Sequence, residues 1–188
     1  LCAARVAYGQ AFQPFPPLPP MPPTSPVNVA NAAKIELGRQ LFFDRRLSSN
    51  LSHSCLTCHN VLGNGSDDRP TIAGAGGKTS SRSPPSLWNV GFYTVYFRDG
   101  RAANLEAAIQ MHLNDPAAMD IGDERVSSRL QSIPGYFTQF RVAFGSDRVT
   151  SETVSKAIAV YLRTLNTQDS AWDRHLRGDV SAINDSAK

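Results

Sequence analysis

The sequence has too few cysteines for a disulfide framework and no hydrophobic run long enough to cross a membrane. Only three cysteines occur in 188 residues, whereas disulfide-stabilised domains carry several paired ones. No segment approaches the roughly 18 consecutive apolar residues of a membrane-spanning helix. The formal charge is only +3, and its scattered basic residues argue against nucleic acid as a partner. We therefore expect a globular chain with no transmembrane span and no nucleic-acid partner.

The alternation of apolar and polar residues that marks half-buried strands is also missing. Apolar residues instead recur at helical spacing. The first segment expected to be helical opens at Asn28 or Asn31 and runs to about Asp44. The others are 102–113, 123–132, 135–143, 150–165 and a short one near 172–178. Between 62 and 86, Gly, Ser, Asp, Thr and Pro dominate, which predicts a long irregular loop of the kind that is usually functional. The sequence therefore predicts an all-α domain with long loops.

The N-terminal part differs in composition from the rest. Eight prolines fall in residues 13–26, so the segment 12–27 is expected to be an extended polyproline II arm. It is either a spacer or an arm that wraps a partner, the latter using Phe15, Leu18 and Met21 between the prolines. The globular domain is then expected to occupy residues 28–188.

Residues 1–11 are mostly small and apolar and end on Gly-Gln-Ala. This composition is compatible with the end of a secretory signal peptide. Cys2 would then belong to the leader. A lipid-modified cysteine is less well supported, because only Leu1 precedes it to form a recognition sequence.

Cys55, Cys58 and His59 form a C-x-x-C-H motif, the attachment sequence of c-type haem. On one helical turn the two thiols face the same porphyrin edge, and the adjacent imidazole is placed to bind the iron. A zinc site that also uses His53 is one alternative, and a redox dithiol is another, but the latter lacks a βαβ context. The motif occurs once, so we expect one covalently bound haem c. Because bacteria attach this haem outside the cytoplasm, we expect a periplasmic protein.

Nine segments share a family pattern, and one of them contains this motif. They are residues 37–44, 46–48, 54–59, 82–89, 99–102, 116–119, 136–140, 143–145 and 172–179. In this order they resemble the bacterial di-haem cytochrome c peroxidase and MauG family, over about residues 28–180. The resemblance implies a cytochrome c-like haem domain.

In that family a first domain holds the peroxidatic haem and a second domain passes electrons to it. The sequence resembles the first domain alone: it stops at Lys188 and has no second C-x-x-C-H. Either the protein carries a single haem, or the other half has been removed or is supplied by another chain. The resemblance thus implies a redox partner protein, which another haem-bearing chain would satisfy.

Several positions depart from the family pattern. Arg98 replaces the tryptophan between the two haems, and Ala108 and Ala118 replace the glutamine and glutamate on the peroxide side. Alanine cannot transfer the proton that peroxide cleavage needs, so these changes favour an electron-transfer protein without catalytic residues. The alternative is an active peroxidase or MauG-like oxidase completed by a second haem domain. Arg101 is expected to be mainly structural, with support of a haem propionate or of an interface as the alternative. Ser83, in place of a calcium-binding asparagine, predicts no calcium.

The same alignment places His112 where the family usually has a proline on the distal side of the haem. On the expected helix His112 lies one turn after Ala108 and shares its inward face. An imidazole there would make a bis-histidine haem with His59, which is closed to substrates and low in potential. We therefore predict His59 and His112 as the two iron ligands.

Four other side chains compete with His112 for the iron. Met111 would face about 100 degrees away from it on an ideal helix, and Met119 matches a methionine that the family keeps for structure. His53 and His175 are expected to be structural or exposed. A histidine with no ligand role remains the alternative for His112 as well.

Overall fold

A computed structural model describes residues 16–187 of the chain. Cys2 and the expected leader segment 1–11 lie outside the described residues. Contacts divide the chain into two units: Met21–Asn166 forms the larger, and the smaller combines the chain up to Pro20 with Thr167 onward. The boundaries predicted for the arm and the domain remain predictions.

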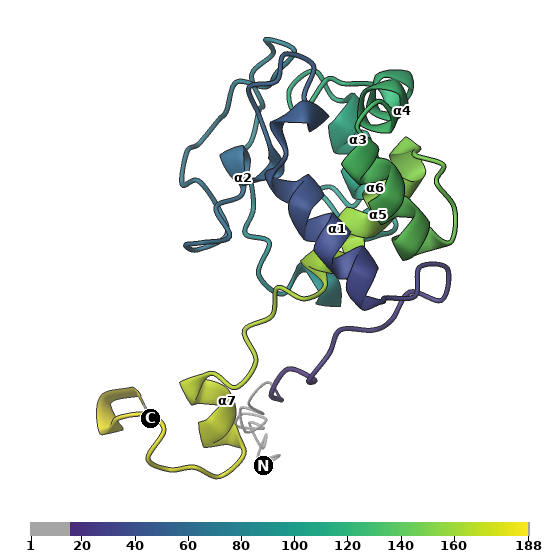
Figure 1. Cartoon of the computed structure of the whole chain (residues 1–188). Coiled ribbons are helices and arrows are strands. Elements are labelled where there is room, and N and C mark those ends of the chain that lie inside the picture. The colour runs from purple at the N-terminus through teal and green to yellow at the C-terminus, as the bar shows by residue number, and fades with distance from the viewer. Residues whose placement is uncertain (1–15, 188) are drawn as a thin grey trace, which may run out of the picture. The chain divides into compact units, whose positions relative to one another are not determined.

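The regular elements among the described residues are helices, and only two isolated β-bridges occur there in place of strands. The helices, in chain order, are α1 (Ala32–Phe43), η1 (Arg45–Leu47), α2 (Cys55–Cys58), η2 (Val90–Phe92), α3 (Leu105–Asn114), α4 (Asp123–Gln131), α5 (Pro134–Phe144), α6 (Ser151–Leu162), α7 (Ala171–Leu176) and η3 (Asp185–Ala187). Figure 1 shows how helices α1 to α6 are arranged within the larger unit. The prediction of an all-α fold is confirmed.

Helices α1 and α6 pack closely at the centre of the larger unit (Figure 1). Their contact is close because Gly38 has no side chain: a Cβ built there would lie 2.0 Å from the carbonyl oxygen of Ala157. Leu41, Phe42 and Ile158 lie in the same core and are almost completely buried. This helix pair forms one wall of the cavity described below.

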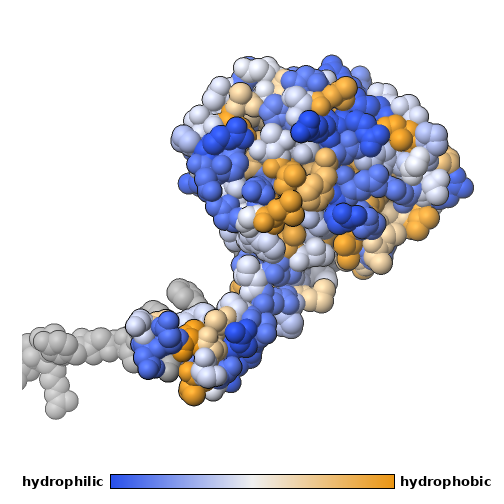
Figure 2. All heavy atoms as spheres, turned by 60° about the vertical axis from the view of Figure 1, so that its left-hand side comes forward, coloured by the Kyte–Doolittle hydropathy of each residue, from blue (hydrophilic) through white to orange (hydrophobic). Residues whose placement is uncertain are grey.

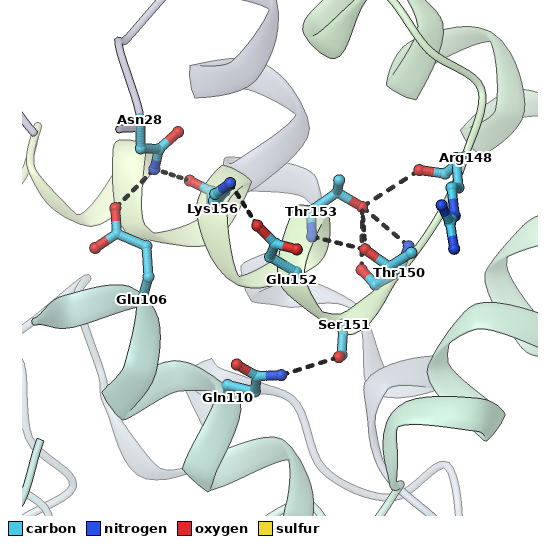
Figure 3. A network of polar contacts seen from close by, with 9 residues as sticks. All are labelled: Asn28, Glu106, Gln110, Arg148, Thr150, Ser151, Glu152, Thr153 and Lys156. Carbon is cyan, nitrogen blue, oxygen red and sulfur yellow. Dashed lines mark hydrogen bonds and ion pairs between the residues drawn. The ribbon is translucent and has the colours of Figure 1, made fainter. Parts of the chain in front are cut away.

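Polar contacts fix α3 against α6. The carboxylate of Glu106 accepts hydrogen bonds from Arg163 at 2.7 and 3.0 Å and from Asn28 at 2.7 Å. One turn later, Gln110 donates to the hydroxyl of Ser151 at 3.3 Å. Figure 3 shows the contacts of Glu106 with Asn28 and of Gln110 with Ser151. These bonds set the rotation of α3 about its axis and thereby which residues of α3 face inward.

The predicted loop over 62–86 contains no helix in the structure. An isolated β-bridge between Ala73 and Thr79 joins two parts of this loop. The loop also packs against the segment after α3, where the amide of Ala75 donates to the carbonyl of Ala118 at 2.7 Å. Gly74 permits this contact, since a Cβ there would lie 2.3 Å from the backbone of Ala117. The loop therefore forms a wall beside α3.

In the smaller unit the side chain of Gln168 donates to the carbonyl of Pro20. Residues 16–27 contain neither helix nor strand, and the polyproline II arm remains a prediction. No helix in the described part of the chain is both long and apolar enough to span a membrane. Figure 2 shows hydrophilic side chains over much of the face in view, with a patch of hydrophobic ones among them.

Candidate haem site

The C-x-x-C-H motif forms the single helical turn α2 and the residue after it. The turn is closed at its start, where the amide of Ser54 donates to the hydroxyl of Thr57 at 3.0 Å, and at its end, where the amide of His59 donates to the carbonyl of Cys55 at 2.9 Å. Cys55, Cys58 and His59 line one cavity as a result. The local sequence alone builds this part of the site.

The cavity consists of two adjoining hollows of about 400 and 250 Å³. Both are lined by Cys58, His59 and His112. The larger hollow has a polar wall from the loop at 79–83, whereas the smaller is almost entirely apolar, with Phe42 and Leu105 in its wall. A space of this size with one polar and one apolar end suits a large, flat, amphipathic cofactor.

The imidazole rings of His59 and His112 lie close together in the lining of this cavity. Their centres are 6.3 Å apart and their planes differ by 65°. When two imidazoles bind one metal from opposite sides, their binding nitrogens lie ~4 Å apart. Each ring centre lies about 1 Å farther from the metal than its nitrogen, so the two centres are about 6 Å apart. The observed separation therefore fits a haem iron between the two rings.

Hydrogen bonds fix which nitrogen of each ring is free. Nδ1 of His59 lies 3.0 Å from the carbonyl oxygen of Pro85, and Nδ1 of His112 lies 2.9 Å from that of Ala108. A carbonyl only accepts, so both Nδ1 atoms carry the proton and donate it. Both Nε2 atoms are then left with a lone pair, the form in which histidine binds metals.

Burial keeps both imidazoles uncharged at neutral pH. Burial, with a smaller contribution from His112, lowers the pKa of His59 to about 4. Burial also lowers the pKa of His112, against the hydrogen bond to Ala108, which raises it. Two neutral imidazoles can approach each other and a cation without losing a proton.

The two thiols are uncharged as well. Burial raises the pKa of Cys55 to about 12 and that of Cys58 to about 11. Nε2 of His53 is hydrogen-bonded to the carbonyl of Ala73 at 2.9 Å, and within residues 16–187 no group of three or more His, Cys, Asp or Glu is gathered as metal ligands. The zinc alternative therefore has no assembled ligand set, and the dithiol alternative has no reactive thiolate.

Arginines stand at the polar end of the cavity. Arg82, Arg98 and Arg101 line the larger hollow. Arg82 and Arg101 both pair with Asp99, at 3.6 and 2.8 Å. Arg98 donates to the hydroxyl of Ser83 at 3.1 Å and has no carboxylate partner among the residues that the structure describes. This end suits an anionic group.

The other candidate residues fall into two groups. Ala108 and Ala118 line the cavity, so the two positions expected on the peroxide side do face it. Met119 also lines the apolar hollow. Met111 is on the outside of α3 with 41% of its surface exposed, and His175 lies on α7 in the smaller unit, where its ring contacts Trp172.

Sequence reasoning did not identify Phe97. Its ring stacks on the imidazole of His112 with centres 5.0 Å apart and planes 9° apart, and the Arg101 guanidinium lies 3.6 Å from the centre of the Phe97 ring. The available signal was weak: Phe97 directly precedes Arg98 and lies three positions before Gly100. Nothing in the sequence shows that these residues enclose a histidine of α3.

A helical fold with this motif beside a cavity that two imidazoles face has the arrangement of a haem-binding domain of the c type. The family model described as di-haem cytochrome c peroxidase matches residues 32–181. The chain belongs to the di-haem cytochrome c peroxidase and MauG family, as its sequence motifs predicted.

Individual relatives agree with this assignment. The methylamine utilization protein MauG of Methylorubrum extorquens is 40% identical over 156 residues, covering 82% of this chain and 44% of MauG. The cytochrome c551 peroxidase of Pseudomonas aeruginosa is 39% identical over 150 residues, covering 79% of this chain and 43% of the peroxidase. The chain spans less than half the length of these relatives.

Solved structures show the same fold. The crystal structure of a MauG-like protein associated with microbial copper homeostasis superposes with a TM-score of 0.76 and 29% identity, over 86% of this chain and 49% of that one. The diheme peroxidase BthA from Burkholderia thailandensis superposes with a TM-score of 0.65 at 22% identity, over 79% of this chain and 43% of BthA. The family binds c-type haem and uses it for electron transfer.

Proposed function

We propose that this chain is a periplasmic haem domain that transfers electrons. It carries one haem c, bound covalently through Cys55 and Cys58, with His59 and His112 as the two iron ligands. The observation that carries the proposal is the pair of adjacent imidazoles, 6.3 Å apart, each with its Nδ1 held by a backbone carbonyl. When bound, the haem supplies a one-electron couple.

The residues around the haem would each hold a different part of it. The apolar hollow, lined by Phe42, Leu105 and Ile109, would exclude water from the ring. The polar hollow would receive the two carboxylates of the haem, because guanidinium groups pair well with carboxylates. Arg98 is the best placed of the three arginines, since it has no acidic partner in the described chain.

The distal side favours electron transfer over peroxide chemistry. Ala108 and Ala118 present methyl groups to the cavity, and neither can hold or move a proton. The neutral His112 occupies the space where a peroxide would need to enter. A site closed in this way holds its two ligands in both oxidation states, as an electron carrier requires.

The redox partner is part of the proposal. The chain spans 44% of MauG and 43% of the peroxidase. A domain that corresponds to the rest of these relatives is therefore the first candidate for the redox partner, either in the same protein or in another haem-bearing chain.

A second candidate function follows from the family: with a second haem domain, the chain would be half of an active peroxidase or MauG-like oxidase.

The spin state of the ferric haem distinguishes the two functions. The chain should be produced with haem attached in a bacterial periplasm, and the covalent bond checked by haem staining after denaturing electrophoresis. We expect a low-spin spectrum for the wild type and a high-spin spectrum for His112→Ala. Met111→Ala is the matched control: the neighbouring side chain is exposed on α3, so its spectrum should equal that of the wild type.

Two results would overturn the proposal. Loss of the haem stain on the denaturing gel would exclude covalent attachment. A high-spin wild type that reacts with hydrogen peroxide would exclude the closed electron-transfer site and favour the enzyme.

A further inference from the structure

Three side chains form a continuous stack that ends on His112. The guanidinium of Arg101 lies 3.6 Å from the centre of the Phe97 ring, and the same ring is nearly parallel to the imidazole of His112, with centres 5.0 Å apart and planes 9° apart. The Phe97 ring therefore contacts both the imidazole and a cation.

The backbone around Phe97 is built to direct this ring inward. Phe97 has φ of +64°, a conformation that bulky residues rarely adopt. A tight loop holds it: the amide of Gly100 donates to the carbonyl of Phe97 at 3.2 Å, and Tyr96 pairs with Ala102 through two backbone hydrogen bonds of 2.9 and 3.4 Å. Unfavourable backbone conformations that the surroundings maintain are frequent at functional sites.

The cation at the outer end of the stack is fixed as well. Nη1 of Arg101 donates to both carboxylate oxygens of Asp99, at 2.9 and 2.8 Å. Asp99 also pairs with Arg82 at 3.6 Å. These ion pairs hold Arg101, whose side chain is 43% exposed, beside the phenyl ring.

Phe97 also lies at the boundary between the cavity and the surface. It lines both hollows of the haem cavity and, on its other side, a surface hollow on the outside of α3 shared with Arg101 and Met111. His112 lines the cavity but not the surface hollow. Phe97, Arg101 and Asp115 line both the cavity and the surface hollow, so these three residues form the boundary between them.

We propose that Phe97, clamped by Arg101, is a positioning residue for the distal ligand. The inference rests on the proposed function, in which His112 binds the iron. The hydrogen bond from Nδ1 to Ala108 fixes one edge of the imidazole, and the stacked ring of Phe97 fixes its plane. Together they keep His112 in place and exclude external ligands from the sixth position of the iron.

Cyanide binding to the haem-loaded full chain tests this inference, because cyanide can bind only when His112 leaves the iron. Phe97→Leu keeps an apolar wall but removes the stack, so we expect about tenfold faster cyanide binding and a larger high-spin fraction. Phe97→Tyr keeps the stack and should restore both values. Arg101→Gln removes the clamp and should give a smaller change in the same direction. This variant also tests the proposal if Phe97→Leu does not fold.

A second aromatic pair in the chain supplies the matched control. The guanidinium of Arg141 lies 4.7 Å from the ring of Phe137 on α5, and neither residue lines the haem cavity. Phe137→Leu should therefore leave the cyanide rate and the spin state unchanged. If Phe97→Leu and Arg101→Gln both bind cyanide at the wild-type rate while His112→Ala turns high-spin, the clamp is refuted and the distal ligand stands. If His112→Ala leaves the spectrum unchanged, the proposed function itself fails.

Discussion

The close crossing of α1 and α6 makes a quantitative prediction for Gly38→Ala. The new methyl group would lie 2.0 Å from the carbonyl oxygen of Ala157 and 2.9 Å from Cβ of Tyr161, whereas ordinary contact begins at 3.4 Å. The nearest obstacle is helix backbone, so the two helices have to move apart. Overpacking of this kind costs about 1–3 kcal/mol, and the better helix propensity of alanine returns about 1 kcal/mol.

Because the obstacle is a backbone carbonyl, the cost should lie at the upper end of that range. We expect a net loss of about 2 kcal/mol in the free energy of unfolding, which is a fall of about 4–8 °C in the melting temperature of a chain of this size. Urea unfolding followed by far-ultraviolet circular dichroism measures the loss, provided that the slope with denaturant stays that of the wild type.

Gly135→Ala is the matched control. Gly135 also lies in a helix, α5, but a Cβ there meets nothing within 4 Å. This variant should be as stable as the wild type or gain up to about 1 kcal/mol. Equal stability of the Gly38 and Gly135 variants would refute the argument from helix packing.

Two further predictions concern a buried ion pair and the haem attachment. Glu106→Gln leaves Arg163 partly buried without its charged partner and should cost about 3 kcal/mol, whereas Glu36→Gln breaks an exposed pair and should cost less than about 1 kcal/mol. Burial would raise the pKa of Glu106, but hydrogen bonds and charge hold this pKa below its ordinary value. The ion pair therefore stabilises the fold at pH values above the pKa that Glu106 has in the unfolded chain. The difference in free energy of unfolding between the wild type and Glu106→Gln, measured by urea titration, should shrink as the pH falls through the pKa of the folded state. Cys58→Ser should keep a covalent haem on Cys55 by mass spectrometry, and replacing both cysteines should abolish the haem stain; a stain that survives the double change would contradict the attachment.

Features that depend on a few neighbouring residues could be predicted from the sequence. The motif at 55–59 needs only one helical turn to bring its side chains to one cavity, and the structure forms that turn between Ser54 and His59. Helical spacing likewise predicted α1, α3, α4, α5 and α6 to within a few residues at each end. The family could be identified from short segments because their order and spacing are preserved along the chain.

The sequence also suggested His112, but only the fold brings it to His59. The two residues are 53 positions apart, and the distance between their rings depends on how α3 is rotated against α6. That rotation is set by Glu106 and Gln110, whose partners lie elsewhere in the chain. No periodicity within α3 contains this information.

The stack on His112 was not predictable, for a physical reason. A positive φ is usually signalled by glycine or asparagine, and Phe97 carries no such signal. The close approach at Gly38 was equally hidden, because a glycine within a helical pattern is compatible with both open and crowded surroundings. The sequence by itself determined the haem motif, the helices and the family, since these depend on local spacing. Only the tertiary structure decided what faces His59 and what covers His112, because contacts between distant segments depend on the packing of the whole unit.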